Sequence, residues 1–284
     1  MTLGRKLQKN NPTVLVRKSL DVENEASVIS KHFDTTYYRS QIAPNSLVIG
    51  RYSCLPFYKE LEEELALNNS CLINSFNQHT YIADAKNWIH DIPEYTPKTY
   101  DNWYNLPEGS YIVKGSTNSR KSSWHTHMFA PTKDDVQIIA ERLMDDQFIF
   151  SQGLIIREYI PLVTFDYAIN GLPITNEWRF FFYKENMLSY GWYWSSHIDV
   201  FEEKNPQISS DGILFAEKIA KIISKNTNFF VLDVAETLSG DWIVIEVNDG
   251  SQSGLSMSDP DVLFGNLKII LENENLDSPD KDCQ

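Results

Sequence analysis

Three oxygen-bearing side chains in the last third of the chain are spaced as ligands for a hard cation. Asp233 lies in the apolar run FFVLDVAE, and Glu246 and Asn248 lie two residues apart in the next run, WIVIEVND. Side chains alternate between the two faces of a strand, so Glu246 and Asn248 share a face, and antiparallel pairing through the Ser-Gly-Asp turn would bring Asp233 to them. Such donors suit Mg²⁺ that holds phosphates. A hairpin with solvated polar positions fits the same pattern.

A lysine followed by a small-residue loop forms a second candidate site, this one for phosphate. Lys114 ends the apolar strand YIVK, and residues 115–123 read GSTNSRKSS. Backbone N–H groups and hydroxyls of such a loop can approach phosphate oxygens, with positive charge from the lysine and from Arg120 and Lys121. The loop is not a Walker A motif, because G-x-x-x-x-G-K-[ST] does not occur. A surface lysine at a strand end is the alternative.

Two further apolar strands carry charged residues. Arg157 and Glu158 lie near the end of LIIREYIPL, where the backbone could meet an adenine edge or could simply end a strand before a proline. Glu177 and Arg179 share one face of the strand EWRFFFY. Arg179 is then either a charge clamp in a cleft or an edge residue whose head reaches water.

The softer metal ligands form no convincing site. His125 and His127, in WHTHMF, could point the same way from a strand, but no third soft ligand is near in sequence. Cys54, Cys71 and Cys283 lack metal-type spacing. An odd, sparse set of cysteines indicates reduced thiols and a cytoplasmic protein.

Composition limits the partners. Of the 284 residues, 42% are hydrophobic and 23% are charged, which is ordinary for a soluble protein. No apolar run is long enough for a bilayer, and the basic N-terminus lacks the apolar stretch of a secretory signal. The formal charge of −14 argues against binding to a nucleic-acid backbone.

The pattern of elements predicts two domains and a tail. Strands alternate with helices over residues 1–100, including a helix over 81–90, which favours a small α/β domain with a parallel sheet. After a turn-rich stretch, residues 101–270 contain longer and more often sequential strands, which favours an α+β domain. Residues 271–284 are acidic and are expected to be a disordered tail. Further helices are expected at 133–144 and 211–224.

In their order along residues 110–255, these motifs resemble the ATP-grasp superfamily. The shared features are a strand lysine with a flexible loop, an adenine-hinge strand ending in an acid, a charged strand, and a final D…E-x-N pair. The wording VLDVAE…IEVNDGSQSGL is similar to a divergent phage and bacterial branch, related to the eukaryotic ATP-grasp protein that assembles a translation-initiation factor. The resemblance implies an α+β ATP-grasp fold, in which two subdomains clasp the nucleotide, preceded by a small α/β pre-ATP-grasp domain.

The resemblance also implies ATP, one or two Mg²⁺ ions, and roles for individual residues. Those assigned to the nucleotide are Lys114, Gly115, Ser119, Arg157, Glu158, Tyr159, Ile160 and Glu177. Those assigned to the metal are Asp233, Glu246 and Asn248, and those assigned to the reacting groups are Arg179, Arg120 and Lys121. The chain departs from the family in its basic, serine-rich loop and in lacking a proline after E-x-N. Lys98 is the nearest, but poor, candidate for the family's upstream second lysine.

The leading interpretation is a cytoplasmic, Mg²⁺-dependent, ADP-forming ligase. It would activate a carboxylate as an acyl-phosphate and join it to an amine, with small-molecule or peptide substrates and no membrane or nucleic-acid partner. Two alternatives stay open. One is an ATP-binding assembly factor for a protein partner, and the other is a phosphotransferase that uses the same cleft.

Overall fold

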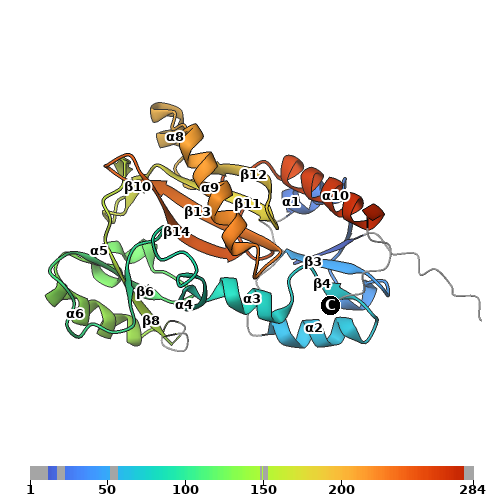
Figure 1. Cartoon of the computed structure of the whole chain (residues 1–284), viewed down its shortest axis with the longest axis horizontal. Coiled ribbons are helices and arrows are strands. Elements are labelled where there is room, and N and C mark those ends of the chain that lie inside the picture. Colours follow the sequence, from blue (N-terminus) through green and yellow to red (C-terminus); the bar gives the residue numbers. More distant parts are fainter. Residues whose placement is uncertain (1–11, 18–22, 52–56, 148, 150–152, 278–284) are drawn as a thin grey trace, which may run out of the picture.

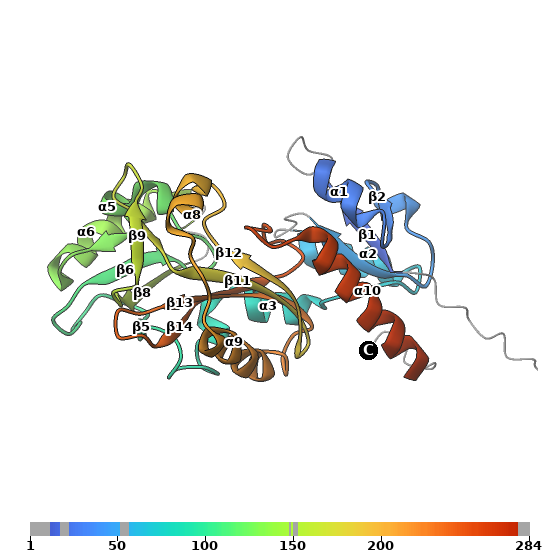
Figure 2. The same ribbon diagram turned by 90° about the horizontal axis from the view of Figure 1, so that it is seen from above.

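The computed structural model describes residues 12–17, 23–51, 57–147, 149 and 153–277. Three four-stranded sheets and one two-stranded sheet are arranged along an elongated molecule (Figure 1). The N-terminal sheet and the last helix lie at one end, and the sheet formed by residues 99–158 lies at the other (Figure 2). In the described ranges, no helix combines the length and apolar character needed to cross a bilayer.

The N-terminal unit is built around a parallel sheet, as expected. Its strands are β1 (Thr13–Val16), β2 (Asp34–Thr36), β3 (Leu47–Arg51) and β4 (Cys71–Leu72), in the order β2-β1-β3-β4. Its helices are α1 (Glu23–Ile29), α2 (Tyr58–Ala66) and the short 3-10 helix η1 (Arg39–Gln41). Every residue of β1 is buried, which suits a parallel strand covered on both faces.

The central sheet is antiparallel, in the order β12-β11-β13-β14. Its strands are β11 (Glu177–Tyr183), β12 (Asn186–Trp192), β13 (Phe229–Glu236) and β14 (Trp242–Asp249). One face packs on α9 (Ser210–Ile223), and the other packs on the N-terminal unit and α10 (Pro260–Asp277). Phe181 and Phe229 bury the second face, and further along the same strands that face carries Arg179 and Asp233.

The third sheet holds the lysine strand. Its strands are β5 (Thr99–Tyr100), β6 (Tyr111–Gly115), β7 (Phe129–Ala130) and β8 (Leu154–Glu158), in the antiparallel order β5-β8-β6-β7. The predicted helix α6 (Lys133–Met144) covers it, and a capping box between Thr132 and Asp135 starts that helix. Between the second and third sheets lie the hairpin β9 (Thr164–Tyr167) and β10 (Pro173–Thr175) and the helix α8 (Ile198–Lys204).

The helix expected over 81–90 is two helices, α3 (Phe76–Ala83) and α4 (Ala85–Trp88). Asp84 interrupts them because its backbone is extended and its side chain accepts a hydrogen bond from the Lys86 backbone N–H, which starts the second helix. The first helix begins at a capping box between Ser75 and Gln78. These helices connect the N-terminal unit to the rest of the chain.

Three other expectations need correction. His125 and His127 lie in a short helix, α5 (Trp124–His127), because Trp124 and Met128, four residues apart, both pack into the core. Cys71 is disulfide-bonded and not a reduced thiol, since pairing depends on spatial neighbours and not on sequence spacing. The helix α10 continues to Asp277, past the expected boundary at residue 270.

Candidate active site

Two ion pairs lie where the central sheet meets the third sheet. Strand register places Arg179, Asp233 and Glu246 opposite one another on β11, β13 and β14. Arg179 donates from Nε to Asp233 Oδ1 and from Nη2 to Asp233 Oδ2, both at 2.8 Å, and from Nη1 to the carbonyl of Gly254. Burial would lower the pKa of Arg179, but Asp233 outweighs it and the net shift is upward. Asp233 is fully buried.

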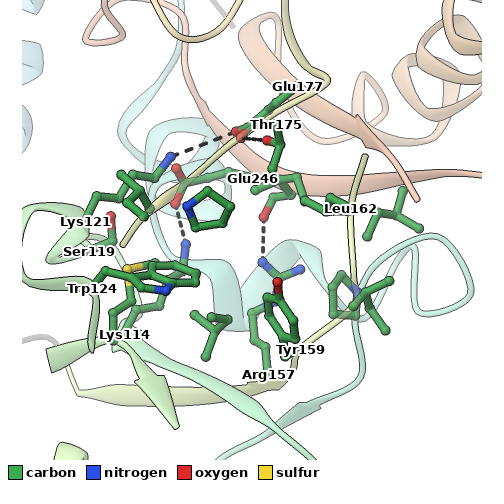
Figure 3. Close-up of a pocket in the computed structure, with 18 of the residues that line it drawn as sticks. Lys114, Ser119, Lys121, Trp124, Arg157, Tyr159, Leu162, Thr175, Glu177 and Glu246 are labelled. Carbon is green, nitrogen blue, oxygen red and sulfur yellow. Dashed lines mark hydrogen bonds and ion pairs between the residues drawn. The ribbon is translucent and has the colours of Figure 1, made fainter. Parts of the chain in front are cut away.

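The second ion pair joins the two sheets. Lys114 Nζ, from β6, lies 2.5 Å from Glu246 Oε1, from β14 (Figure 3). Burial would raise the pKa of Glu246, but Lys114 and then Lys121 lower it to about 2, and Asn248 adds a side-chain hydrogen bond. Burial lowers the pKa of Lys114, and Glu246 offsets part of that shift. The carboxylate is therefore held charged beside a lysine that is poorly solvated.

A largely apolar pocket opens beside this pair. Its lining includes Ile112, Trp124, Met128, Leu162, Leu172 and Ile245, together with Lys114, Ser119, Lys121, Arg157, Glu158, Tyr159, Ile160, Glu177 and Glu246. The Glu158 carboxylate accepts a hydrogen bond of 2.7 Å from the Tyr100 hydroxyl. The Tyr159 N–H donates to the Ser110 carbonyl, whereas the Ile160 N–H has no hydrogen bond among the described residues. The strand end thus leaves one backbone donor available at an apolar cavity.

Lys121, from the loop after β6, extends into the pocket through aromatic contacts. Its Nζ donates to the Tyr193 hydroxyl at 2.8 Å and lies 5.0 Å from the centre of the Trp194 ring. Its Nζ also lies 3.9 Å from Glu177 Oε1, an enclosed atom without a hydrogen-bond partner (Figure 3). Burial raises the pKa of Glu177 to about 7, although Lys121 opposes the shift. The other loop cation, Arg120, pairs with Asp146.

Arg157 has a supporting position under the pocket. It is buried, and its guanidinium donates to the carbonyl of Ile245 at 2.5 Å and to the hydroxyl of Thr96. It also lies over the Trp88 ring, with 5.9 Å between the guanidinium carbon and the ring centre. Burial lowers the pKa of Arg157 to about 10. These contacts fix β14, and with it Glu246, against the third sheet.

A second, polar pocket adjoins the first and shares Ser119 and Glu246 with it. Its lining includes His79, Thr117, Asn118, Arg179, Asn248, Asp249, Gln252, Ser253 and Gly254. Most of the predicted site residues therefore line one pocket or both. Three of them, Gly115, Arg120 and Asp233, line neither.

Several lining residues were not predicted from the sequence. Tyr193 and Trp194 hold Lys121, and the aromatic run GWYWSS that contains them was a usable signal. His79 and Asp249 line the polar pocket, but nothing in their local sequence separates them from ordinary helix and turn residues. Long-range packing brings them to the site.

The donors present fit Mg²⁺ in part. Glu246 and Asn248 offer carboxylate and amide oxygens at the polar pocket, whereas both Asp233 oxygens are bound by Arg179. Among the described residues, no group of three or more His, Cys, Asp or Glu could hold a metal ion. Mg²⁺ commonly takes one or two protein oxygens and completes its shell with phosphates and water. Two protein donors are therefore sufficient if a nucleotide supplies the others.

Comparison with known proteins identifies the family. Residues 101–267 match a family model of the ATP-grasp domain, clade family 3. The match covers more than half of the chain, so the chain belongs to this ATP-grasp family. A search of curated proteins by sequence found no match.

Solved structures of ATP-grasp enzymes have the same fold along the length of the chain. D-cycloserine synthetase DcsG is 11% identical with a TM-score of 0.60, over 91% of this chain and 99% of its own. The ATP-grasp ligase PsnB, complexed with its precursor peptide PsnA2 and AMPPNP, is 10% identical with a TM-score of 0.55, over 96% and 99%. D-alanyl-alanine synthetase A from Vibrio cholerae is 12% identical with a TM-score of 0.54, over 95% and 99%. The ATP-grasp fold expected from the sequence is confirmed.

Proposed function

We propose that the chain is an ATP- and Mg²⁺-dependent ligase that joins a carboxylate to an amine and releases ADP and phosphate. The Lys114–Glu246 pair carries the proposal, because it brings a cation and a carboxylate within 2.5 Å at the boundary between the apolar and polar pockets. The lysine suits phosphate oxygens and the carboxylate suits a divalent ion. A nucleotide with its base in the apolar pocket would meet both.

The apolar pocket suits an adenine ring. Trp124 and Leu162 supply apolar contacts, and the Ile160 N–H can donate to the ring edge. Glu158, in the proposed role, accepts from the adenine amino group while its other partner, Tyr100, holds it in place. The solved PsnB complexes with AMPPNP and with Mg and ADP support the choice of ligands.

Glu246 and Asn248 would hold Mg²⁺, which would neutralise charge on the transferring phosphoryl group. Asp233, whose oxygens Arg179 occupies, would position that arginine at the polar pocket. Arg179 would then bind the carboxylate substrate and its acyl-phosphate. Lys121 would supply charge from the loop side, and Glu177 would hold Lys121 in place.

The reaction has two bond exchanges. A carboxylate oxygen attacks the γ-phosphorus, and the bond to ADP breaks. The amine nitrogen then attacks the acyl carbon, the C–O bond to phosphate breaks, and phosphate leaves with the electron pair. Positioning and charge neutralisation account for such chemistry without a protein nucleophile.

The test uses the full chain with ATP, MgCl₂ and a pool of amino acids and dipeptides. Substrate-dependent release of ADP and phosphate supports the ligase, and Lys114→Met should abolish it. Lys98→Met is the matched control, because Lys98 is exposed on the same domain. ATP binding without turnover, together with a co-purifying protein, would favour the assembly factor. A phosphorylated product would indicate a phosphotransferase, and AMP release would indicate adenylation.

A further inference from the structure

A buried histidine–aspartate pair borders the polar pocket and has no role in the reaction described above. His79 lies in α3, from the N-terminal half of the chain, and Asp249 ends β14. The distance between His79 Nδ1 and Asp249 Oδ2 is 2.8 Å, and the two side chains are only 4% and 3% exposed. Both residues line the pocket that also contains Arg179 and Asn248.

The surroundings of Asp249 determine which histidine nitrogen carries the proton. Asp249 Oδ1 accepts hydrogen bonds from Asn74 Nδ2 at 3.2 Å and from the Ser251 backbone N–H at 2.8 Å. A carboxylate held by donors on one oxygen is an acceptor on the other, so His79 Nδ1 must donate to it. The neutral imidazole therefore carries its lone pair on Nε2.

The imidazole ring is also held rigidly. It stacks on the Tyr58 ring, with 3.9 Å between the ring centres and 5° between the planes. The Tyr58 hydroxyl in turn donates to the backbone carbonyl of Asn74 at 2.8 Å. The same three residues, Tyr58, Asn74 and Asp249, thus fix both the plane and the tautomer of His79.

The second nitrogen of His79 is available. Among the described residues, Nε2 has no hydrogen-bond partner, and it is not one of the enclosed side-chain atoms that lack one, so it keeps accessible surface. A buried histidine with a purely structural role satisfies both of its ring nitrogens. An ordered lone pair at a pocket indicates a ligand that donates a proton or a hydrogen bond.

We propose, on the basis of the ligase function above, that His79 is the base for the amine substrate and that Asp249 is its positioning residue. As the amine nitrogen forms its bond to the acyl carbon, Nε2 takes one proton from that nitrogen. The C–O bond to phosphate breaks, and phosphate leaves with the electron pair. A base oriented by a buried carboxylate is a recurrent catalytic arrangement.

The first experiment separates the amine step from activation of the carboxylate. The variant His79→Asn keeps a donor toward Asp249 but removes Nε2. His90→Asn, at an exposed position, is the matched control. Each protein receives ATP, MgCl₂ and the amino-acid pool, with either the pool's own amines or added hydroxylamine as the acceptor. Hydroxylamine is already a free base near neutral pH, so its attack on an acyl-phosphate needs no protein base.

We expect His79→Asn to reduce amine-dependent ADP release by about 10²- to 10⁴-fold while hydroxamate formation stays near the wild-type rate. Added imidazole should restore part of the amine-dependent rate. A merely structural role would reduce both arms equally, and that result, like an unchanged amine-dependent rate, overturns the proposal.

The second experiment needs no turnover. Histidine-selective ¹⁵N NMR of the full chain, with His79 assigned by comparison with His79→Asn, reports which ring nitrogen carries the proton. A neutral ring protonated at Nδ1 supports the proposal, and a proton on Nε2 overturns it whatever the activity. If the pool gives no product in either arm, the ligase function fails for those substrates, and the NMR result still decides whether His79 presents a free nitrogen.

Discussion

The two ion pairs at the cleft contain the same charges but lie in different surroundings. Arg179 and Asp233 are register partners on neighbouring strands of one sheet, and the carboxylate is completely buried. Lys114 and Glu246 come from different sheets, and the Glu246 side chain is 19% exposed. The first pair is closed within a rigid sheet, whereas the second bridges two sheets at the edge of both pockets.

The difference indicates which charges can bind a ligand. Arg179 offers a planar fork that both Asp233 oxygens occupy, so the pair satisfies itself. Lys114 is a point charge with three donors, and only one oxygen of Glu246 lies within hydrogen-bond distance of it. A phosphate and a cation can separate Lys114 from Glu246 at little structural cost. The bridging pair is therefore the binding element, and the closed pair is its support.

The largest expected effect concerns the closed pair. Asp233→Asn leaves the Arg179 charge buried without a partner, and we expect it to lower the free energy of unfolding by about 3–5 kcal/mol. From the sequence alone, Asp233→Ala was expected to abolish turnover and spare the fold, so the structure changes this expectation. Urea denaturation of Asp233→Asn beside Asp241→Asn, at an exposed turn position, measures the difference. Equal stability of the two variants would mean that the pair is not structural.

A third acid lies between these extremes and should make stability depend on pH. Burial raises the Glu177 pKa from 4.5 to about 7, so the folded chain binds more protons than the unfolded chain between those values. Stability should therefore fall as the pH rises through this range, by roughly 1–3 kcal/mol from this residue. Glu177→Gln should flatten that slope in urea denaturation measured across the range. An unchanged slope would show that Lys121 keeps the carboxylate charged throughout.

Much of this architecture was accessible from the sequence. The parallel N-terminal sheet, the helix Lys133–Met144 and the hairpin of Asp233 and Glu246 follow from alternation, capping and turn residues, which are local properties. The order of the motifs was sufficient for the ATP-grasp family, because each motif combines a strand with a charged end.

The partners of the charged side chains were not accessible. Asp233 and Arg120 have the residue types of ligand-binding groups, but their partners, Arg179 and Asp146, are chosen by packing across strands and loops. His79 approaches Asp249 over 170 residues of sequence. Period and spacing describe one element at a time, so they predict which face a side chain occupies but not what lies opposite it.

The bridging pair is tested by Glu246→Gln. The amide oxygen can still accept from Lys114, so we expect little change in stability, but the loss of charge should weaken MgATP binding by at least about tenfold, or ~1.4 kcal/mol. Isothermal titration calorimetry with and without Mg²⁺ measures the effect. The Mg²⁺-dependent part of the affinity should disappear first. Equal Mg²⁺ dependence in wild type and variant would remove Glu246 from the metal site.

The smallest effect distinguishes the two cations of the loop. Arg120 pairs with Asp146, keeps 42% of its side chain exposed and lines neither pocket, whereas Lys121 extends to Glu177. Arg120→Ala should therefore change stability by at most about 0.5 kcal/mol and leave MgATP affinity within about twofold of wild type. Lys121→Gln, one residue away, should weaken the affinity by more, and calorimetry of the two variants compares them directly. If Arg120→Ala weakens binding as much as Lys121→Gln, then Arg120 leaves Asp146 when the nucleotide binds, and the loop closes with both cations on the phosphates.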